Sequence, residues 1–387
     1  MRRVQLKGIT WNHSRAFPPL VATAQRFEEL HPGIEIAWEK RSLHAFGHAS
    51  LAELAQLFDL VVVDHPMMGD AETTSSLLDL SQLLDSDCLK EMEQDSAGPS
   101  FASYLYHEKL FALPIDAAAP AASFRPDLLA DAGFAELSQW SEVLELARRG
   151  LVRMPGFPAD LFLNFMGMCV TLGSAVAANS DALFERAIAL ECLDELRELA
   201  TLMPAEIYEW NPIALYERIS STDEFAYCPF AYTYSNYARA GFAPTPLWFA
   251  LSPTLWNGSH LRTVLGGTGL AISTSSTHKE VALEYSLYVA GHVCQSTLYG
   301  VCGGQPARRS AWMDEELNRL TDGFFQQTLP SIEAAYVRPR YPGYAGLQEK
   351  AGVPLADYLQ NGGNASETLD CVDALYRASL PAGELYA

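Results

Sequence analysis

The chain of 387 residues has few basic residues for its size. Its 26 Lys and Arg stand against 47 Asp and Glu, which gives a formal charge of -21 at pH 7. Basic residues do not form runs longer than a pair such as Arg148-Arg149. A protein that grips nucleic-acid phosphates or anionic lipid needs clustered positive charge. We therefore expect no nucleic-acid partner.

Cysteine is also sparse and shows no pairing pattern. The number is odd, the spacing is wide, and neither CxxC nor a Cys/His ligand spacing occurs, so we expect buried free thiols and neither a disulfide framework nor a zinc site. No HExxH, EF-hand, P-loop or dinucleotide pattern is present. We assign no metal and no cofactor. The seven cysteines are Cys88, Cys169, Cys192, Cys228, Cys294, Cys302 and Cys371.

The first residues, MRRVQLKGITW, lack the apolar segment and the small-residue cleavage site of a secretory signal. The sequence as written predicts a cytoplasmic protein, or a periplasmic one if an upstream signal has been removed. Residues 161–180 carry no charge and are long enough to span a membrane. Asn164, Thr171, Ser174 and two glycines interrupt this stretch, so we expect a buried helix with a glycine turn and no membrane span.

The length predicts two domains with substantial cores. At the start of the chain, strand patterns at residues 4–10, 34–38 and 59–63 alternate with helix patterns at 16–30 and 51–58. This order predicts a parallel sheet covered by helices. Ligands of such sheets bind at the carboxyl ends of the strands. Here polar or aromatic residues follow all three strands, so we expect a site at that edge.

Further along the chain, residues 110–116 form another apolar strand pattern that ends in Pro114, Ile115 and Asp116. A strand of this kind suits a crossover between two lobes. Residues 127–201 are almost entirely helical in pattern, and residues 225–230 and 248–251 again read as strands. A glycine turn at 265–269 leads into a strand, and residues 278–291 form an amphipathic helix.

Five motifs occur in the order found in one family. They are FEELHPGIEIAWE, FDLVVVDHPMMGDA, YLYHEKLFALPIDAAAPAASFRPDLLADAGF, LGGTGLAISTSSTHKEVALEYSLYVAG and GGQPARRSAW. Together they span residues 27–312. In these motifs the chain resembles the bacterial ABC-transporter solute-binding proteins of the extracellular solute-binding family 1, many of which bind sugars.

The resemblance implies an α/β, two-lobed periplasmic-binding-protein-like fold, with two mostly parallel sheets flanked by helices and joined by hinge strands. The ligand would lie in the cleft between the lobes, and lobe closure would enclose it. We place lobe 1 at residues 1–115 plus 269–309, lobe 2 at 116–268, and a C-terminal helical segment at 310–387. The implied partners are a small-molecule ligand and, if the chain is exported, an ABC permease.

Candidate ligand-binding residues follow the predicted strand ends. Trp11 offers a flat face for stacking on a sugar ring, Arg15 a two-pronged grip on a carboxylate, and His13 a hydrogen bond. Adjacent residues on a strand point in opposite directions, so at most one of Asp64 and His65 faces the ligand. The full predicted set is Trp11, His13, Arg15, Asp64, His65, Asp116, Tyr227, Tyr232, Tyr234, Gly267 and Thr268.

Two readings of these residues remain open. In the first, the chain binds a sugar or a hydroxylated organic acid and releases it unchanged, either for transport or as a ligand-sensing subunit. In the second, a cytoplasmic enzyme on the same fold uses His13 or His65 for acid/base chemistry, oriented by Asp64, on a small anionic substrate held by Arg15. Fold-level analogy favours binding, and the histidines and the start of the chain favour the enzyme.

Overall fold

The computed structural model describes residues 3–42 and 50–381, and the chain folds as two units. Unit 1 comprises Met1–Ala118, Leu265–Glu333 and Arg340–Pro342, and unit 2 comprises Ala119–Val264, Ala334–Pro339 and Gly343–Ala387. The sequence-based division differs mainly at the C-terminus. Residues 310–333 belong to unit 1 and most of the following residues to unit 2, because these helices pack on two different cores.

The sheet of unit 1 has the strand order β2-β1-β3-β10-β6. Strand β1 (Val4–Trp11) pairs in parallel with β2 (Ile34–Arg41) and β3 (Leu60–Val63). Strand β10 (Gly266–Ile272) is antiparallel to both β3 and β6 (Leu113–Ala118). All four residues of the central strand β3 are buried, as expected for a strand covered on both faces, and all six residues of the edge strand β6 are buried as well. The predicted strands are confirmed.

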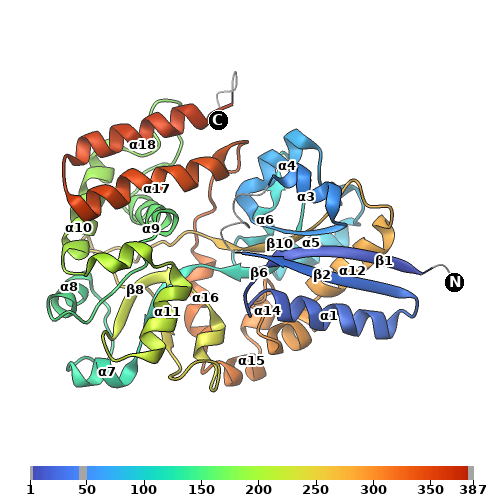
Figure 1. Cartoon of the computed structure of the whole chain (residues 1–387), viewed down its shortest axis with the longest axis horizontal. Coiled ribbons are helices and arrows are strands. Elements are labelled where there is room, and N and C mark those ends of the chain that lie inside the picture. Colours follow the sequence, from blue (N-terminus) through green and yellow to red (C-terminus); the bar gives the residue numbers. More distant parts are fainter. Residues whose placement is uncertain (1–2, 43–49, 382–387) are drawn as a thin grey trace. The chain divides into compact units, whose positions relative to one another are not determined.

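Helices cover both faces of this sheet (Figure 1). Helix α1 (Phe17–Leu30) and helix α12 (Lys279–Ala290) lie along one side, where Phe27 of α1 packs against Tyr285 of α12 with ring centroids 5.3 Å apart. Helices α3 (Leu51–Leu57) and α4 (Met68–Thr74) lie on the other side. The remaining elements of unit 1 are η1 (His65–Met67), η2 (Leu80–Gln82), α5 (Ser86–Gln94), α6 (Ser100–Ser103), β4 (Leu105–Tyr106), β5 (Lys109–Leu110), α13 (His292–Cys294), the π-helix η5 (Gln295–Tyr299), α14 (Arg309–Trp312), α15 (Glu315–Leu320) and α16 (Phe324–Glu333).

The sheet of unit 2 has the order β8-β7-β9. Strand β7 (Pro120–Phe124) is antiparallel to both β8 (Tyr227–Tyr232) and β9 (Trp248–Ala250). The expectation of a second mostly parallel sheet is therefore wrong for these strands. The reason lies in the connection: after a long helical segment the chain enters the sheet again at the end where β7 finished, so that Tyr227 at the start of β8 pairs with Phe124 at the end of β7.

Unit 2 is otherwise built from helices. Helix α9 (Pro158–Thr171) lies in the uncharged stretch, and a glycine turn with Gly173 at φ +99° follows it, so the predicted buried helix is confirmed. Among the described residues no helix is long and apolar enough to cross a membrane. Helix α9 packs closely on α17 (Tyr344–Asn361). The other elements of unit 2 are α7 (Pro126–Asp131), α8 (Trp140–Arg148), α10 (Arg186–Thr201), η3 (Ala205–Glu209), α11 (Pro212–Ser221), η4 (Ser235–Ala238) and α18 (Ala365–Ser379).

Candidate functional site

One edge of the unit 1 sheet collects most of the predicted site residues. Strands β1, β3 and β6 run in the same direction and end there, and the antiparallel strand β10 begins there. Trp11 is the last residue of β1, Asp64 follows β3, and Asp116 lies near the end of β6. The turns after these three strands therefore meet at one edge, as the strand order predicted.

A buried ion pair forms the centre of this edge. Arg15 Nε donates to Asp116 Oδ2 at 2.8 Å, and Arg15 Nη2 contacts the other carboxylate oxygen. The side chains are 5% and 2% exposed. Burial raises the pKa of Asp116, while the Arg15 guanidinium and a hydrogen bond from the backbone of Gln305 oppose that shift. The guanidinium N–H groups of Arg15 that were predicted to bind a ligand carboxylate are therefore bound to Asp116.

Trp11 and His13 extend this cluster. The His13 ring stacks on Trp11 with centroids 5.3 Å apart and an interplanar angle of 12°, and the Arg15 guanidinium carbon lies 5.6 Å from the Trp11 ring centroid. His13 Nδ1 accepts the backbone N–H of Arg15 at 3.0 Å. Burial, helped by the charge of Arg15, lowers the pKa of His13 to about 3. The ring is therefore neutral at pH 7 and carries its proton on Nε2, which makes that atom a hydrogen-bond donor.

Asp64 and His65 differ in exposure, although His65 Nδ1 lies 3.3 Å from Asp64 Oδ1. Asp64 accepts the backbone N–H of His65 at 2.8 Å and so caps η1, and its side chain is 27% exposed. The His65 side chain is fully buried, and the ring of Tyr104 meets it edge-on with centroids 6.2 Å apart. Of this pair, only Asp64 is accessible to solvent.

Gly267 and Thr268 bring β10 against Asp116. Gly267 has φ +106°, and a Cβ there would lie 2.2 Å from the carbonyl oxygen of Asp116. This position therefore requires glycine. Thr268 is 6% exposed and stands opposite Asp116 in the strand register. The glycine turn thus supports the carboxylate's strand through close backbone packing.

The three predicted tyrosines belong to unit 2. Tyr227 is 1% exposed and stacks on Phe124 with centroids 6.2 Å apart, so it is part of the unit 2 core. Tyr232 is partly exposed at the end of β8. Tyr234 is buried, and its ring meets the ring of Tyr216 edge-on with centroids 6.1 Å apart. Whether any of the predicted residues contacts a ligand stays a prediction.

Gln305 and Arg41 were not among the predicted residues. Gln305 is fully buried, accepts the backbone N–H of Ala117 at 3.0 Å, and donates its side-chain amide to the Ala117 carbonyl at 2.8 Å. These two hydrogen bonds fix the backbone of β6 at Ala117, the residue after Asp116. Arg41 ends β2 directly opposite Trp11, and burial lowers its pKa to about 10. A polar residue at a strand end was the available signal for Arg41, whereas a loop glutamine carries no such signal.

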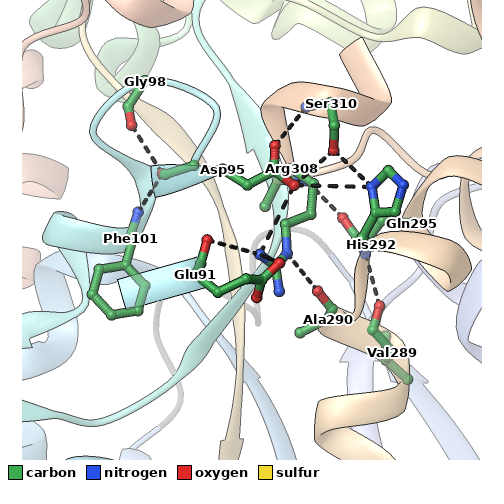
Figure 2. Close-up of polar contacts among 12 residues, drawn as sticks. Glu91, Asp95, Gly98, Phe101, Val289, Ala290, His292, Gln295, Arg308 and Ser310 are labelled. Atoms are coloured by element: carbon green, nitrogen blue, oxygen red, sulfur yellow. Dashed lines mark hydrogen bonds and ion pairs between the residues drawn. The ribbon is translucent and has the colours of Figure 1, made fainter. Parts of the chain in front are cut away.

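A second polar cluster in unit 1 surrounds the buried side chain of Arg308 (Figure 2). Arg308 donates to the Ala290 carbonyl at 2.8 Å and to Glu91 at 3.0 Å. Nearby, Ser310 Oγ donates to Asp95 at 2.6 Å and lies 2.7 Å from His292 Nδ1. In a catalytic Ser-His-Asp triad the histidine lies between the other two residues. Here the serine lies between the histidine and the aspartate, so the cluster is not a hydrolase triad. Its hydrogen bonds link α5, α12 and the residues around Arg308.

In the part of the chain that the structure describes, no group of three or more His, Cys, Asp or Glu is placed to hold a metal ion. The arrangement at the sheet edge offers other chemistry: a stacked aromatic ring, a neutral imidazole donor, an accessible carboxylate and a buried neutral ion pair. Trp11 is 3% exposed because His13 stacks on its ring and Arg15 lies beside it. The groups of this edge that solvent reaches are His13 and Asp64, which can hydrogen-bond hydroxyl groups.

These features define an α/β fold of the two-lobed periplasmic-binding-protein type, which confirms the fold expected from the sequence. Similar solved structures cover nearly the whole chain. Maltose-bound MalE3 of T. maritima has a TM-score of 0.83 at 16% identity, with 97% of this chain and 100% of that chain covered.

Two further structures show the same fold. An ABC transporter solute-binding protein from Agrobacterium radiobacter K84 in complex with ribitol has a TM-score of 0.80 at 17% identity, with 97% and 99% of the two chains covered. One from Agrobacterium vitis S4 with bound D-mannitol has a TM-score of 0.76 at 16% identity, with 97% of each chain covered. No protein-family model and no curated protein matches the sequence.

Proposed function

We propose that this chain is a solute-binding protein that captures a small, uncharged polyhydroxyl ligand, a sugar or a polyol. The observation that carries the proposal is the cluster of Trp11, His13, Arg15 and Asp116 at the strand ends of unit 1, on a fold shared with structures that hold maltose, ribitol and mannitol.

The electrostatics of the cluster favour a neutral ligand over an acid. Asp116 balances the charge of Arg15 through a bidentate contact, and His13 is neutral at pH 7 because its pKa is lowered to about 3. The accessible Asp64 adds a negative charge that repels a carboxylate and accepts hydrogen bonds from hydroxyl groups. A hydroxylated organic acid, the other ligand class expected from the sequence, fits this surface less well.

The enzyme reading loses its main support in the same cluster. An acid/base catalyst works best when its pKa is near the working pH. The pKa of His13 lies far below that range, and the His65 side chain is fully buried. Our proposal therefore keeps release of an unchanged ligand, closure of the two units on it, and an ABC permease as the partner of an exported form. The compartment stays a prediction.

A thermal-shift panel tests this proposal. Maltose, ribitol, mannitol and tagatose are compared with sugar acids of matched size, and we expect at least one neutral compound to raise the melting temperature by several degrees while its acid counterpart does not. Trp11→Ala should abolish the shift and Trp11→Phe should retain part of it. Trp140→Ala, at a tryptophan of unit 2 that is as buried as Trp11 (2% against 3% exposed), is the matched control and should keep the shift. A panel in which only acids stabilise the protein contradicts the proposed ligand class.

A further inference from the structure

The chain passes between the two units three times within a short stretch that begins at the end of α16. Residues 334–339 belong to unit 2, residues 340–342 to unit 1, and the chain from Gly343 onward to unit 2 again. A segment of unit 1 that is only three residues long, segment 340–342, is therefore joined to unit 2 at both of its ends.

The Arg340 side chain fixes this segment to unit 1. Its Nη1 atom donates to three backbone carbonyl oxygens, those of Ala102 at 2.7 Å, Ser103 at 3.2 Å and Leu105 at 2.6 Å. These carbonyls lie at the end of α6 and at the start of β4, and the last carbonyls of a helix have no partner within the helix. The guanidinium thus binds backbone groups that need a donor.

The backbone of segment 340–342 packs on helix α4. The Gly69 N–H donates to the Arg340 carbonyl at 2.9 Å. A Cβ on Gly69 would lie 2.3 Å from that carbonyl oxygen and 2.6 Å from the Pro342 nitrogen, so the close approach requires glycine. The segment is therefore held on unit 1 at two separate places, α4 and the end of α6.

The residues on either side of the segment are held in unit 2. Before it, Arg338 is 3% exposed and donates to Gln348 of α17 at 2.8 Å. After it, Gly343 has φ +94°, and a Cβ there would lie 2.9 Å from the carbonyl oxygen of Ser379 at the end of α18. Each unit thus fixes its own part of the stretch, and the changes of direction between them fall at the joints 339–340 and 342–343.

We propose that segment 340–342 limits the relative motion of the two units, and that Arg340 is the positioning residue that holds it in place. Proline fixes φ at positions 339 and 342, so few backbone torsions at the two joints are free to change. A restricted motion leaves fewer arrangements for a ligand to order when the units close, and this favours binding. This last step rests on the proposed function, because it requires closure on a ligand.

Distance measurements on the ligand-free protein test the restriction without any sugar. Spin labels are introduced as non-natural amino acids at two exposed positions, Leu57 of unit 1 and Val353 of unit 2, and pulsed electron paramagnetic resonance gives the distribution of distances. We expect a broader distribution in Arg340→Met than in the wild-type chain. Hydrogen exchange at the Gly69 N–H should become faster in this variant, because the segment leaves α4.

A second variant and a control separate this role from a general loss of structure. Gly69→Ala displaces the segment from the side of α4 and leaves Arg340 intact, so it should also broaden the distribution, and it tests the proposal even where Arg340→Met does not fold. Arg309→Met is the matched control, because Arg309 is an exposed arginine of unit 1 that lies 2.8 Å from Glu333, directly before the stretch. It should leave the distribution unchanged.

Calorimetry then connects the restriction to ligand capture, with the compound among maltose, ribitol, mannitol and tagatose that binds the wild-type chain most tightly. If release of the segment leaves about one tenth of the molecules in the binding-competent arrangement, Kd rises about tenfold in Arg340→Met. An unchanged Kd in a variant with a broader distribution overturns the role of Arg340 in capture.

Two results of the ligand-free measurements overturn the proposal as a whole. The first is a distribution that is as narrow in Arg340→Met and Gly69→Ala as in the wild-type chain. The second is an exchange rate of the Gly69 N–H that does not change in Arg340→Met, which would show that Arg340 does not hold the segment. Failure of the wild-type chain to bind any compound of the panel would contradict the proposed function and would leave the distance result standing.

Discussion

Removal of one partner from the buried Arg15–Asp116 pair should strongly destabilise unit 1. In Arg15→Met the Asp116 carboxylate stays buried, with 2% of its side chain exposed, and loses two contacts from the guanidinium. A buried ion left without its partner typically costs about 3–5 kcal/mol. We expect a loss of that size in the free energy of unfolding, measured by urea denaturation at pH 7 with tyrosine and tryptophan fluorescence.

The pH dependence gives this prediction a second readout. Without Arg15, only the backbone hydrogen bond opposes the effect of burial, so the pKa of Asp116 should rise further. A carboxyl group whose pKa is raised in the folded state favours folding when protonated, and this contribution is lost as the pH rises through the folded-state pKa. The difference between wild type and Arg15→Met should therefore shrink when the pH is lowered from 7 to 5.

Two controls isolate the buried charge. Arg148→Met removes an exposed arginine that lies 2.7 Å from Glu198, and it should cost less than about 1 kcal/mol. The double variant Arg15→Met/Asp116→Leu replaces both charges by apolar groups and should recover most of the lost stability. A single variant that loses no more than Arg148→Met, or a double variant that is less stable than the single one, would refute the reasoning.

Two other predictions concern stability. Because the pKa of His13 is about 3 in the folded state and near 6.5 when unfolded, the unfolded state gains a proton first as the pH falls. His13→Asn should therefore gain about 2 kcal/mol relative to wild type between pH 7 and pH 5 in urea titrations, and a constant difference would contradict this. In α17, a Cβ on Gly352 would lie 1.9 Å from the Pro158 carbonyl, whereas Gly346 has open space. Gly352→Ala should lower the melting temperature and Gly346→Ala should raise it, with about 1 kcal/mol gained from helix propensity; shifts of the same sign would contradict the packing.

The early part of the fold was predictable because its signals are local. Apolar runs identified β1, β3 and β6, and the right-handed order of strands and helices placed their ends at one edge. The partner of Arg15 was not predictable in this way, because Asp116 lies 101 positions away. Only the assembly of the sheet, in which β3 and β10 lie between β1 and β6, brings the ends of β1 and β6 to one edge. The antiparallel direction of β10 and of the unit 2 sheet likewise depends on long connections that local patterns do not describe.

The candidate site shows the same division. Asp64 is partly exposed and His65 is buried, and the expectation that at most one of them faces a ligand stays a prediction. The requirement for glycine at Gly267 was not apparent from the sequence, because it depends on the approach of the Asp116 carbonyl from another strand. Gln305 was missed because its role depends on a contact with Ala117 in a distant strand. The core position of Tyr227 was not apparent because an aromatic residue on a strand has the same local pattern whether it faces a core or a ligand.

The most direct test of the account is calorimetric titration of the wild-type protein with the neutral sugar or polyol that stabilises it most, followed by mass spectrometry of the recovered ligand. We predict a single site with micromolar affinity and a ligand of unchanged mass. No binding heat with any sugar or polyol of the panel, or recovery of a chemically converted compound, would contradict the proposal that this chain is a binding protein.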